Sequence, residues 1–244
     1  MWPLYDQELA YIHAAAFGGL AQGAAPEIVR RLKSAAVRIR KVVDVGCGAG
    51  PLTSALVKAG FEVTGVDSSA ELLAIARAAV PRAHFVNASV YEEEIPACEA
   101  IVALGEPLTY HAEGTDADGL VRKFFQRASD ILPAGGMLIF DVIELGEPSL
   151  AGRLWSSGED WAVLVSTEED QGSRTLARNI ETFRRVDNLY RRGREAHRVH
   201  LFDAGELCRQ LAACGFETET AKAYGSQRLG PRRRAFFSTR IRQA

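Results

Sequence analysis

Three glycines at alternate positions give the sequence its clearest chemical signal. They follow an apolar run at residues 42–45 as Gly46, Gly48 and Gly50, and Pro51 then begins a helix-like segment. Glycine lacks Cβ and adopts positive φ readily, so such a loop lets the backbone pass close to a ligand. The helix behind it begins with unpaired N–H groups and the positive end of its dipole, and proline suits its first position. We therefore expect a nucleotide-like or zwitterionic ligand at the end of a parallel strand.

The spacing of these glycines separates two classes of cofactor. A dinucleotide-binding fingerprint, G-x-G-x-x-G, would place its third glycine at position 51, where the chain has Pro51. The observed order is D-x-G-x-G-x-G from Asp44, and the next predicted strand, residues 61–66, is followed by Asp67. A carboxylate at that point can accept hydrogen bonds from two ribose hydroxyls. The alternative is a glycine-rich turn that binds nothing. The presence of both the glycine motif and the acid after the next strand argues against this alternative.

Together these motifs resemble motif I and the following acidic position of the class I S-adenosylmethionine-dependent methyltransferases. The resemblance covers about residues 38–244 and is most specific over residues 42–67. It implies S-adenosylmethionine as cofactor and S-adenosylhomocysteine as product, with no metal. Asp44 would order the loop and the methionine part, and Asp67 would take the ribose hydroxyls. The implied cofactor-binding residues are Asp44, Gly46, Cys47, Gly48, Gly50, Asp67, Ser68, Ser89, Val90, Leu104, Gly105 and Tyr11.

Methyl transfer depends more on positioning than on a catalytic group, because the sulfonium already activates the methyl. The protein must bring the acceptor atom in line with the C–S bond and exclude water. A general base helps when that atom carries a proton, and we predict Glu106, Glu195 and His197 as candidates. Glu195 and His197 are two apart on a predicted strand, so their side chains point the same way. For a lone histidine, the alternative is a surface or otherwise satisfied polar residue.

Strands and helices alternate along most of the chain, which predicts a doubly wound α/β fold. Apolar strands are expected at 42–45, 61–66, 84–87, 100–104 and 137–142, with helices at 52–59, 68–80 and 116–132. The last two strands, 216–221 and 235–241, are joined by a plain loop, which permits an antiparallel pair. With the resemblance, this indicates a mostly parallel, seven-stranded Rossmann-like methyltransferase sheet with an antiparallel final strand and a β insertion.

The insertion interrupts the α/β pattern at about residues 147–202. Asp187-Asn188 is a good two-residue hairpin turn between strands at 175–186 and 189–201. That turn places Arg178 opposite His197, Ile180 opposite Glu195, and Glu181 opposite Arg194. We therefore divide the chain into an N-terminal helical cap (1–37), a methyltransferase core (38–146 and 203–244) and an antiparallel lid or interface (147–202).

The composition limits the kinds of partner that the protein is expected to bind. The 244 residues carry a net charge of −2 and no apolar run long enough to span a bilayer, and no secretory signal begins the chain. The four cysteines form no C-x-x-C, so neither zinc nor a disulfide framework is expected, and the chain is assigned to the cytoplasm. Basic clusters at 184–194 and 232–234 lie among acids, which favours a solvated face, a partner subunit or an acidic substrate group over nucleic acid.

The predicted function is methyl transfer from S-adenosylmethionine to an oxygen or nitrogen of a small-molecule acceptor. Residues 104–110 lack the Asn/Asp-Pro-Pro-aromatic motif of enzymes that methylate nucleic-acid amines, so DNA is not expected as a substrate, and neither is a membrane. The alternatives are an RNA or protein methyltransferase, a non-catalytic cofactor binder, or an oxidoreductase. A homodimer is left open.

Overall fold

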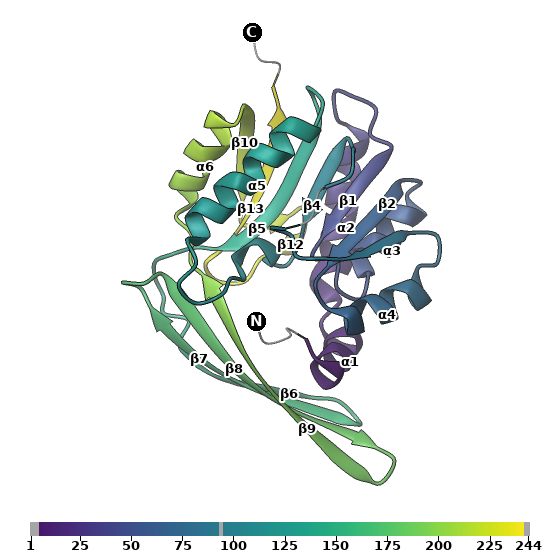
Figure 1. The fold of residues 1–244 in the computed structure, drawn as a ribbon, viewed down its shortest axis with the longest axis vertical. Helices are drawn as coiled ribbons and strands as arrows, with labels where there is room; N and C mark the ends of the chain where they lie inside the picture. The colour runs from purple at the N-terminus through teal and green to yellow at the C-terminus, as the bar shows by residue number, and fades with distance from the viewer. Residues whose placement is uncertain (1–4, 93–94, 242–244) are drawn as a thin grey trace.

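A seven-stranded sheet with helices on both faces forms the body of the molecule, and a second sheet lies across one end of it (Figure 1). The computed structural model describes residues 5–92 and 95–241. In the first sheet the strand order is β10-β13-β5-β4-β1-β2-β3, and β13 runs antiparallel to both of its neighbours. The predicted fold class is therefore confirmed. The strands are β1 Lys41–Val45, β2 Glu62–Asp67, β3 His84–Asn87, β4 Ala100–Ala103, β5 Met137–Ile143, β10 Phe216–Ala221 and β13 Arg233–Arg240.

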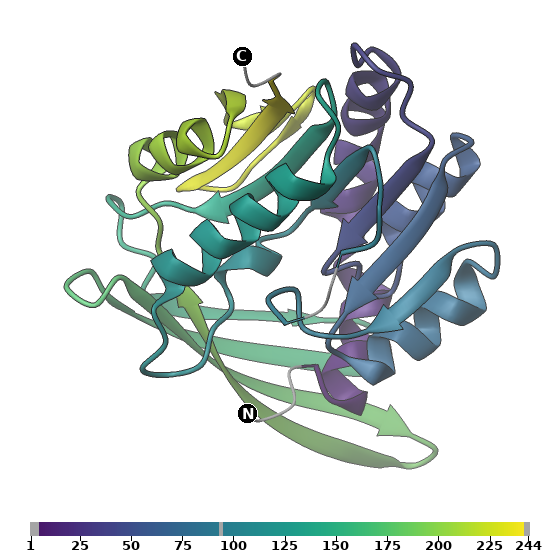
Figure 2. The ribbon, with the colours of Figure 1, turned by 45° about the horizontal axis from the view of Figure 1, so that its top comes forward.

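Helices cover both faces of this sheet (Figure 2). They are α1 Gln7–Ala16, α2 Gly19–Lys33, α3 Pro51–Lys58, α4 Ala70–Ala79, α5 Ala117–Ile131 and α6 Ala204–Ala213, with a 3₁₀ turn at Pro107–Thr109. Four begin at side-chain caps that satisfy free N–H groups, with Asp6 before α1, Ser69 before α4, Asp116 before α5 and Asp203 before α6. None of the helices in the described ranges is long and apolar enough to cross a membrane.

The second sheet is the predicted insertion, and we call it the lid. It consists of β6 Gly152–Ser157, β7 Trp161–Asp170, β8 Thr175–Val186 and β9 Leu189–His200, in that order. The hairpin register is confirmed, with Arg178 opposite His197 and Ile180 opposite Glu195. The left-handed φ of 58° at Asp187 is what a two-residue turn of this kind requires.

Three strands were not predicted from the sequence. Strand β6 is exposed along almost its whole length, with Trp155 77% exposed, so its sequence carries no alternation between buried and solvent positions. The segment after β10, expected to be a plain loop, forms a small hairpin from β11 Ala223–Tyr224 and β12 Gln227–Arg228. Two-residue strands lie below the length at which periodicity can be recognised.

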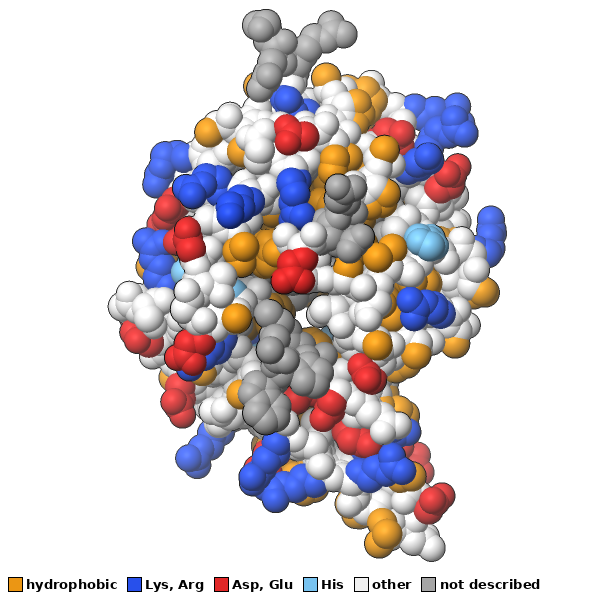
Figure 3. All heavy atoms as spheres, viewed as in Figure 1, with side chains coloured by type: hydrophobic (Ala, Val, Ile, Leu, Met, Phe, Trp, Pro, Cys, Tyr) orange, Lys and Arg blue, Asp and Glu red, His pale blue; other side chains and the backbone are white. Residues whose placement is uncertain are grey.

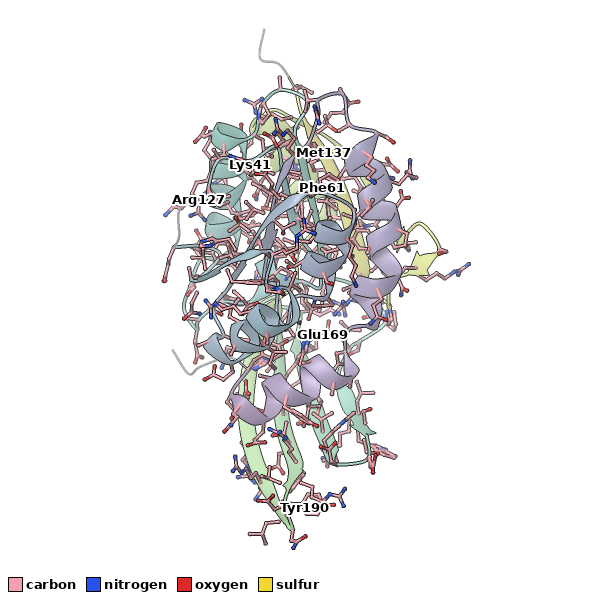
Figure 4. The ribbon with its side chains drawn as sticks, turned by 90° about the vertical axis from the view of Figure 1, so that its right-hand side faces the viewer. Lys41, Phe61, Arg127, Met137, Glu169 and Tyr190 are labelled. Atoms are coloured by element: carbon pink, nitrogen blue, oxygen red, sulfur yellow. The ribbon has the colours of Figure 1, made fainter. Side chains whose placement is uncertain are left out.

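The lid faces the carboxyl ends of the parallel strands. Lys41 and Met137, which begin β1 and β5, lie at the end of the body farthest from the lid (Figure 4). Helix α1 lies between the lid and the body, where Leu9 and Ile12 pack against lid residues Val163 and Ile180. Ligands of open α/β sheets bind at the carboxyl ends of strands, so the lid and α1 cover the expected site.

Candidate functional site

The glycine loop after β1 is shaped for close backbone contact. Gly46 has a φ of 67°, and a Cβ there would lie 2.3 Å from Cβ of Pro107. Gly48 has a φ of 55°, but a Cβ there would meet only Cε1 of His13, at 3.9 Å. Gly46 is therefore needed for packing inside the protein, whereas Gly48 borders open space beside α1. That space is where a ligand would meet the loop.

Asp67 joins the glycine loop to the start of α4. Its buried carboxylate accepts hydrogen bonds from the backbone N–H of Gly48 at 2.8 Å and of Ser69 at 2.9 Å. Burial raises the pKa of Asp67 above its ordinary value. Each carboxylate oxygen can accept a second hydrogen bond, so Asp67 can hold the loop and still receive ribose hydroxyls. The adjacent Ser68 is exposed.

Asp44 and Cys47 lie on the protein side of the loop. Asp44 accepts a hydrogen bond from the Thr53 hydroxyl at 2.6 Å, which ties β1 to α3, and burial raises the pKa of Asp44 to about 7. Cys47 packs in a small apolar cluster that includes Phe85, and burial raises the pKa of its thiol. A protonated, buried thiol is inert, so Cys47 contributes backbone and packing.

The loops after β3 and β4 form the rest of the site at the carboxyl ends of the parallel strands. Ser89 is half-buried and its hydroxyl accepts from the Tyr91 N–H at 3.3 Å, while the neighbouring Val90 carbonyl accepts from Arg127 at 2.9 Å. Leu104 and Gly105 follow β4, and the N–H of Gly105 donates to Asp141 at 2.8 Å. The N–H of Gly105 is thus already occupied, which leaves its carbonyl and the Leu104 backbone for a ligand.

Helix α1 presents His13, not Tyr11, to the glycine loop. The Tyr11 hydroxyl donates to Asp160 of the lid at 2.7 Å, and the guanidinium of Arg184 lies 3.5 Å from the centre of its ring. Residues two apart on a helix point in nearly opposite directions, so Tyr11 faces the lid and His13 faces Gly48. The expectation that Tyr11 binds the cofactor is not supported by this geometry. Burial and the nearby His197 lower the pKa of His13 to about 4, so its imidazole is neutral at pH 7.

Glu106 lies between the lid and the body and is fully engaged. Its side chain is 2% exposed, and its two oxygens pair with Arg178 of β8 at 2.5 Å and with Arg233 of β13 at 2.6 Å. Arg178 also donates to the Tyr110 hydroxyl at 3.2 Å. Both carboxylate oxygens are occupied by guanidinium groups. Glu106, predicted as a candidate base, is therefore placed as a bridge between the two sheets.

Glu195 and His197 lie side by side on β9, as predicted, and both are buried. Nε2 of His197 lies 2.7 Å from Oε2 of Glu195. The carboxylate also accepts from the backbone N–H groups of Tyr5 at 2.7 Å and Asp6 at 2.9 Å. These hydrogen bonds, the one from His197 first, keep the pKa of Glu195 low although burial opposes them. Glu195 therefore anchors His197 and the N-terminal segment, and both of its oxygens are occupied.

Two further residues belong to this region, and one of them, Tyr5, was not expected there from the sequence. The Tyr5 ring packs 5.2 Å from the His197 ring and 5.0 Å from the His13 ring, and its carbonyl accepts from the Ser69 hydroxyl at 3.0 Å. Asp141, at the end of β5, is completely buried, and its Oδ2 has no hydrogen-bond partner among the described residues. Burial raises the pKa of Asp141 to about 6.

Comparison with known proteins identifies a methyltransferase domain in the chain. Residues 42–136 match the family model of the methyltransferase domain. A Geobacillus sp. strain WCH70 protein named as a methyltransferase is 28% identical over 187 residues, which cover 72% of this chain and 74% of that protein. Among solved structures, an S-adenosylmethionine-dependent methyltransferase from Clostridium acetobutylicum has a TM-score of 0.81 at 17% identity, covering 96% of this chain and 98% of that one.

The chain contains a methyltransferase domain, and it has the fold of the S-adenosylmethionine-dependent methyltransferases. A second similar structure is that of CalS10 with S-adenosylmethionine bound, an amino pentose methyltransferase from Micromonospora echinaspora involved in calicheamicin biosynthesis. Its TM-score is 0.74 at 19% identity, and the match covers 98% of each chain. The methyltransferase domain and these similar structures support S-adenosylmethionine as the cofactor.

The residues of the site fit this cofactor. Open space at Gly48 accommodates a ligand against the loop, and the Asp67 carboxylate, expected to receive the ribose hydroxyls, lies next to that loop. When bound, S-adenosylmethionine supplies an activated methyl group, and the protein must orient and enclose it. Within the described parts of the chain no group of three or more His, Cys, Asp or Glu residues could hold a metal ion.

Proposed function

We propose that this methyltransferase transfers the methyl group to an oxygen or nitrogen of a small-molecule acceptor enclosed between the lid and the strand ends. The observation that carries the proposal is the buried polar cluster at this junction. Glu106, Arg178, Tyr110, Glu195 and His197 come from both sheets and meet at the carboxyl edge. Polar groups gathered at this junction suit a small polar acceptor, and enclosure by the lid would exclude the water that competes with it.

In this proposal the insertion at 147–202 is a lid, and His197 is the general base. Glu195 is an acceptor only, so the hydrogen between it and His197 resides on Nε2 of the imidazole. Nδ1 then carries the free lone pair, and it makes no hydrogen bond with any described residue. An imidazole fixed by a carboxylate on one side and free on the other is the arrangement that a general base requires. Glu195 and Glu106 become positioning residues.

The charges on the lid argue against an RNA substrate. Arg192 and Arg194 pair with Glu181, and Arg184 and Arg191 with Glu8. Figure 3 shows acidic and basic side chains interspersed over the visible face of the lid. Single-stranded nucleic acid requires a continuous basic groove with aromatic platforms. Such compensated charge supports a small acceptor instead.

Replacement of His197 tests the assignment once transfer to an acceptor is measured. His197→Ala should lower the transfer rate at least about tenfold, since a positioned acid–base group contributes about 10²–10⁴. Its affinity for S-adenosylhomocysteine should stay within about twofold of the wild type. His84→Ala, which changes an exposed histidine at the start of β3, is the matched control and should behave as wild type. Equal rates for the two variants would overturn the role of His197.

A further inference from the structure

A cavity lies between the β11–β12 hairpin and the segment that follows β5. Its volume is about 350 Å³, within the range of small-molecule sites. Its charged lining consists of Lys222, Arg228, Arg232, Arg233, Glu144 and Glu147. We call it the basic cavity. It contains two of the three consecutive arginines that the sequence analysis singled out.

The lining carries more positive charge than its own acids compensate. Arg233 is paired with Glu106, which lies outside the cavity, and Glu144 is paired with Arg234 at 2.6 Å. Lys222 and Arg228 make no ion pair with any described residue. The one acid of the lining that is left to balance these two cations is Glu147, which accepts a 3.4 Å hydrogen bond from Gln171. The cavity therefore favours an anion.

Arg232 fixes one wall of the basic cavity where the lid meets the body. Its side chain is 4% exposed, and it donates to Glu169 at 2.6 Å and to the carbonyls of Glu144 at 2.8 Å and Pro148 at 3.1 Å. Figure 4 shows Glu169 at this junction. Nη2 of Arg232 has no hydrogen-bond partner among the described residues. These contacts fix the Arg232 side chain in place and leave its Nη2 group available as a hydrogen-bond donor.

We propose that the basic cavity binds an anionic group, a carboxylate or a phosphate, of the methyl acceptor. Arg233 links the two places, because it lines the cavity and also donates to Glu106 in the buried polar cluster. An acceptor held at its anionic end by Lys222, Arg228 and Arg232 would extend past Arg233 toward the transfer site. Guanidinium and ammonium groups bind such anions through charge-assisted hydrogen bonds. This inference rests on the proposed function for the place where the acceptor lies.

Calorimetric titration with inorganic pyrophosphate and with citrate tests the cavity. The protein is saturated with S-adenosylhomocysteine, and ionic strength is held constant because exposed charges are screened by salt. The double variant Lys222→Ala/Arg228→Ala removes two exposed, unpaired cations and leaves Arg232 and Arg233 in place. The matched control, Lys58→Ala/Arg82→Ala, removes one lysine and one arginine that are exposed at the opposite end of the sheet.

We expect at least one anion to bind wild type and control alike, and to bind the cavity variant about tenfold more weakly. Tighter binding of pyrophosphate would identify a phosphate, and tighter binding of citrate a carboxylate. Absence of saturable binding, or equal affinity in the two double variants, would overturn the proposal. This test is independent of the proposed function. If the methyl group proves to be transferred to a macromolecule, loss of anion affinity in the cavity variant would still support an anion site in the cavity.

Discussion

Glu106→Gln should destabilise the protein strongly, because it leaves two half-buried guanidiniums without their shared, buried anion. The side chain of Glu106 is 2% exposed, and those of Arg178 and Arg233 are 18% and 26% exposed. Glutamine keeps the shape and one acceptor oxygen, but it removes the charge and turns an NH₂ group toward an arginine. The change therefore tests the electrostatic link between lid and body.

The expected size follows from the geometry. At an effective dielectric constant of about 20, two charges about 4 Å apart attract by about 4 kcal/mol, so the two pairs of Glu106 amount to about 8 kcal/mol. The cost of desolvating the ions and the repulsion between the two arginines offset part of this. Removing one partner of a buried pair costs about 3–5 kcal/mol in the free energy of unfolding, and we expect Glu106→Gln to fall in that range.

Urea denaturation followed by circular dichroism measures the effect, since urea, unlike guanidinium chloride, does not screen charges. Glu181→Gln is the matched control, because Glu181 also binds two arginines, both at 2.8 Å, but is 34% exposed. Its urea midpoint should stay at the wild-type value. Equal midpoints for the two variants, at unchanged slope, would refute the view that burial makes the Glu106 link strong.

Three further changes probe the cofactor side. Asp67→Ala should weaken S-adenosylmethionine binding at least about tenfold in calorimetry, since it removes two charge-assisted hydrogen bonds to ribose worth about 1.5–3 kcal/mol each; unchanged affinity in a folded variant would exclude Asp67 from the site. Gly48→Val should abolish S-adenosylhomocysteine binding, because a side chain at φ 55° strains the turn and fills the space beside the loop; a wild-type dissociation constant would contradict the assignment. Asp44 has a folded pKa of about 7, above the unfolded value of about 3.9, so its contribution to stability is lost as pH rises from about 4 to 7. Wild type should therefore lose stability relative to Asp44→Asn over that interval, and parallel pH profiles from urea midpoints would count against this account.

The local motifs could be read from the sequence because each is set by its own residues. The glycine spacing and Asp67 predicted a turn and an acid that the fold brings within 2.8 Å of each other, through the Gly48 N–H. The hairpin register followed from the Asp187-Asn188 turn, since turn length fixes which residues lie opposite each other. Alternation of strands and helices predicted the doubly wound α/β class, and the family resemblance supplied the antiparallel final strand.

Relations between distant elements could not be read in this way. Tyr11 and His13 lie on the same predicted helix, and the sequence does not show which of them faces the glycine loop. The rotation of α1 about its axis decides that His13 meets Gly48. Glu106 and Glu195 look like free carboxylates until β8, β13 and the N-terminal segment bring their partners. The arginines at 232–234, which suggested a solvated face, each pair with an acid from another element.

The central claim is that the methyl group is transferred to a small molecule, and fractionation of a radiolabelled reaction tests it most directly. The enzyme is incubated with S-adenosylmethionine carrying a tritiated methyl group and a cell extract, and the products are separated into metabolites, RNA and protein. We predict label in the metabolite fraction that disappears with Asp67→Ala and is identified by mass spectrometry. Label confined to RNA or protein, or no transfer by an enzyme that binds the cofactor, would contradict the account.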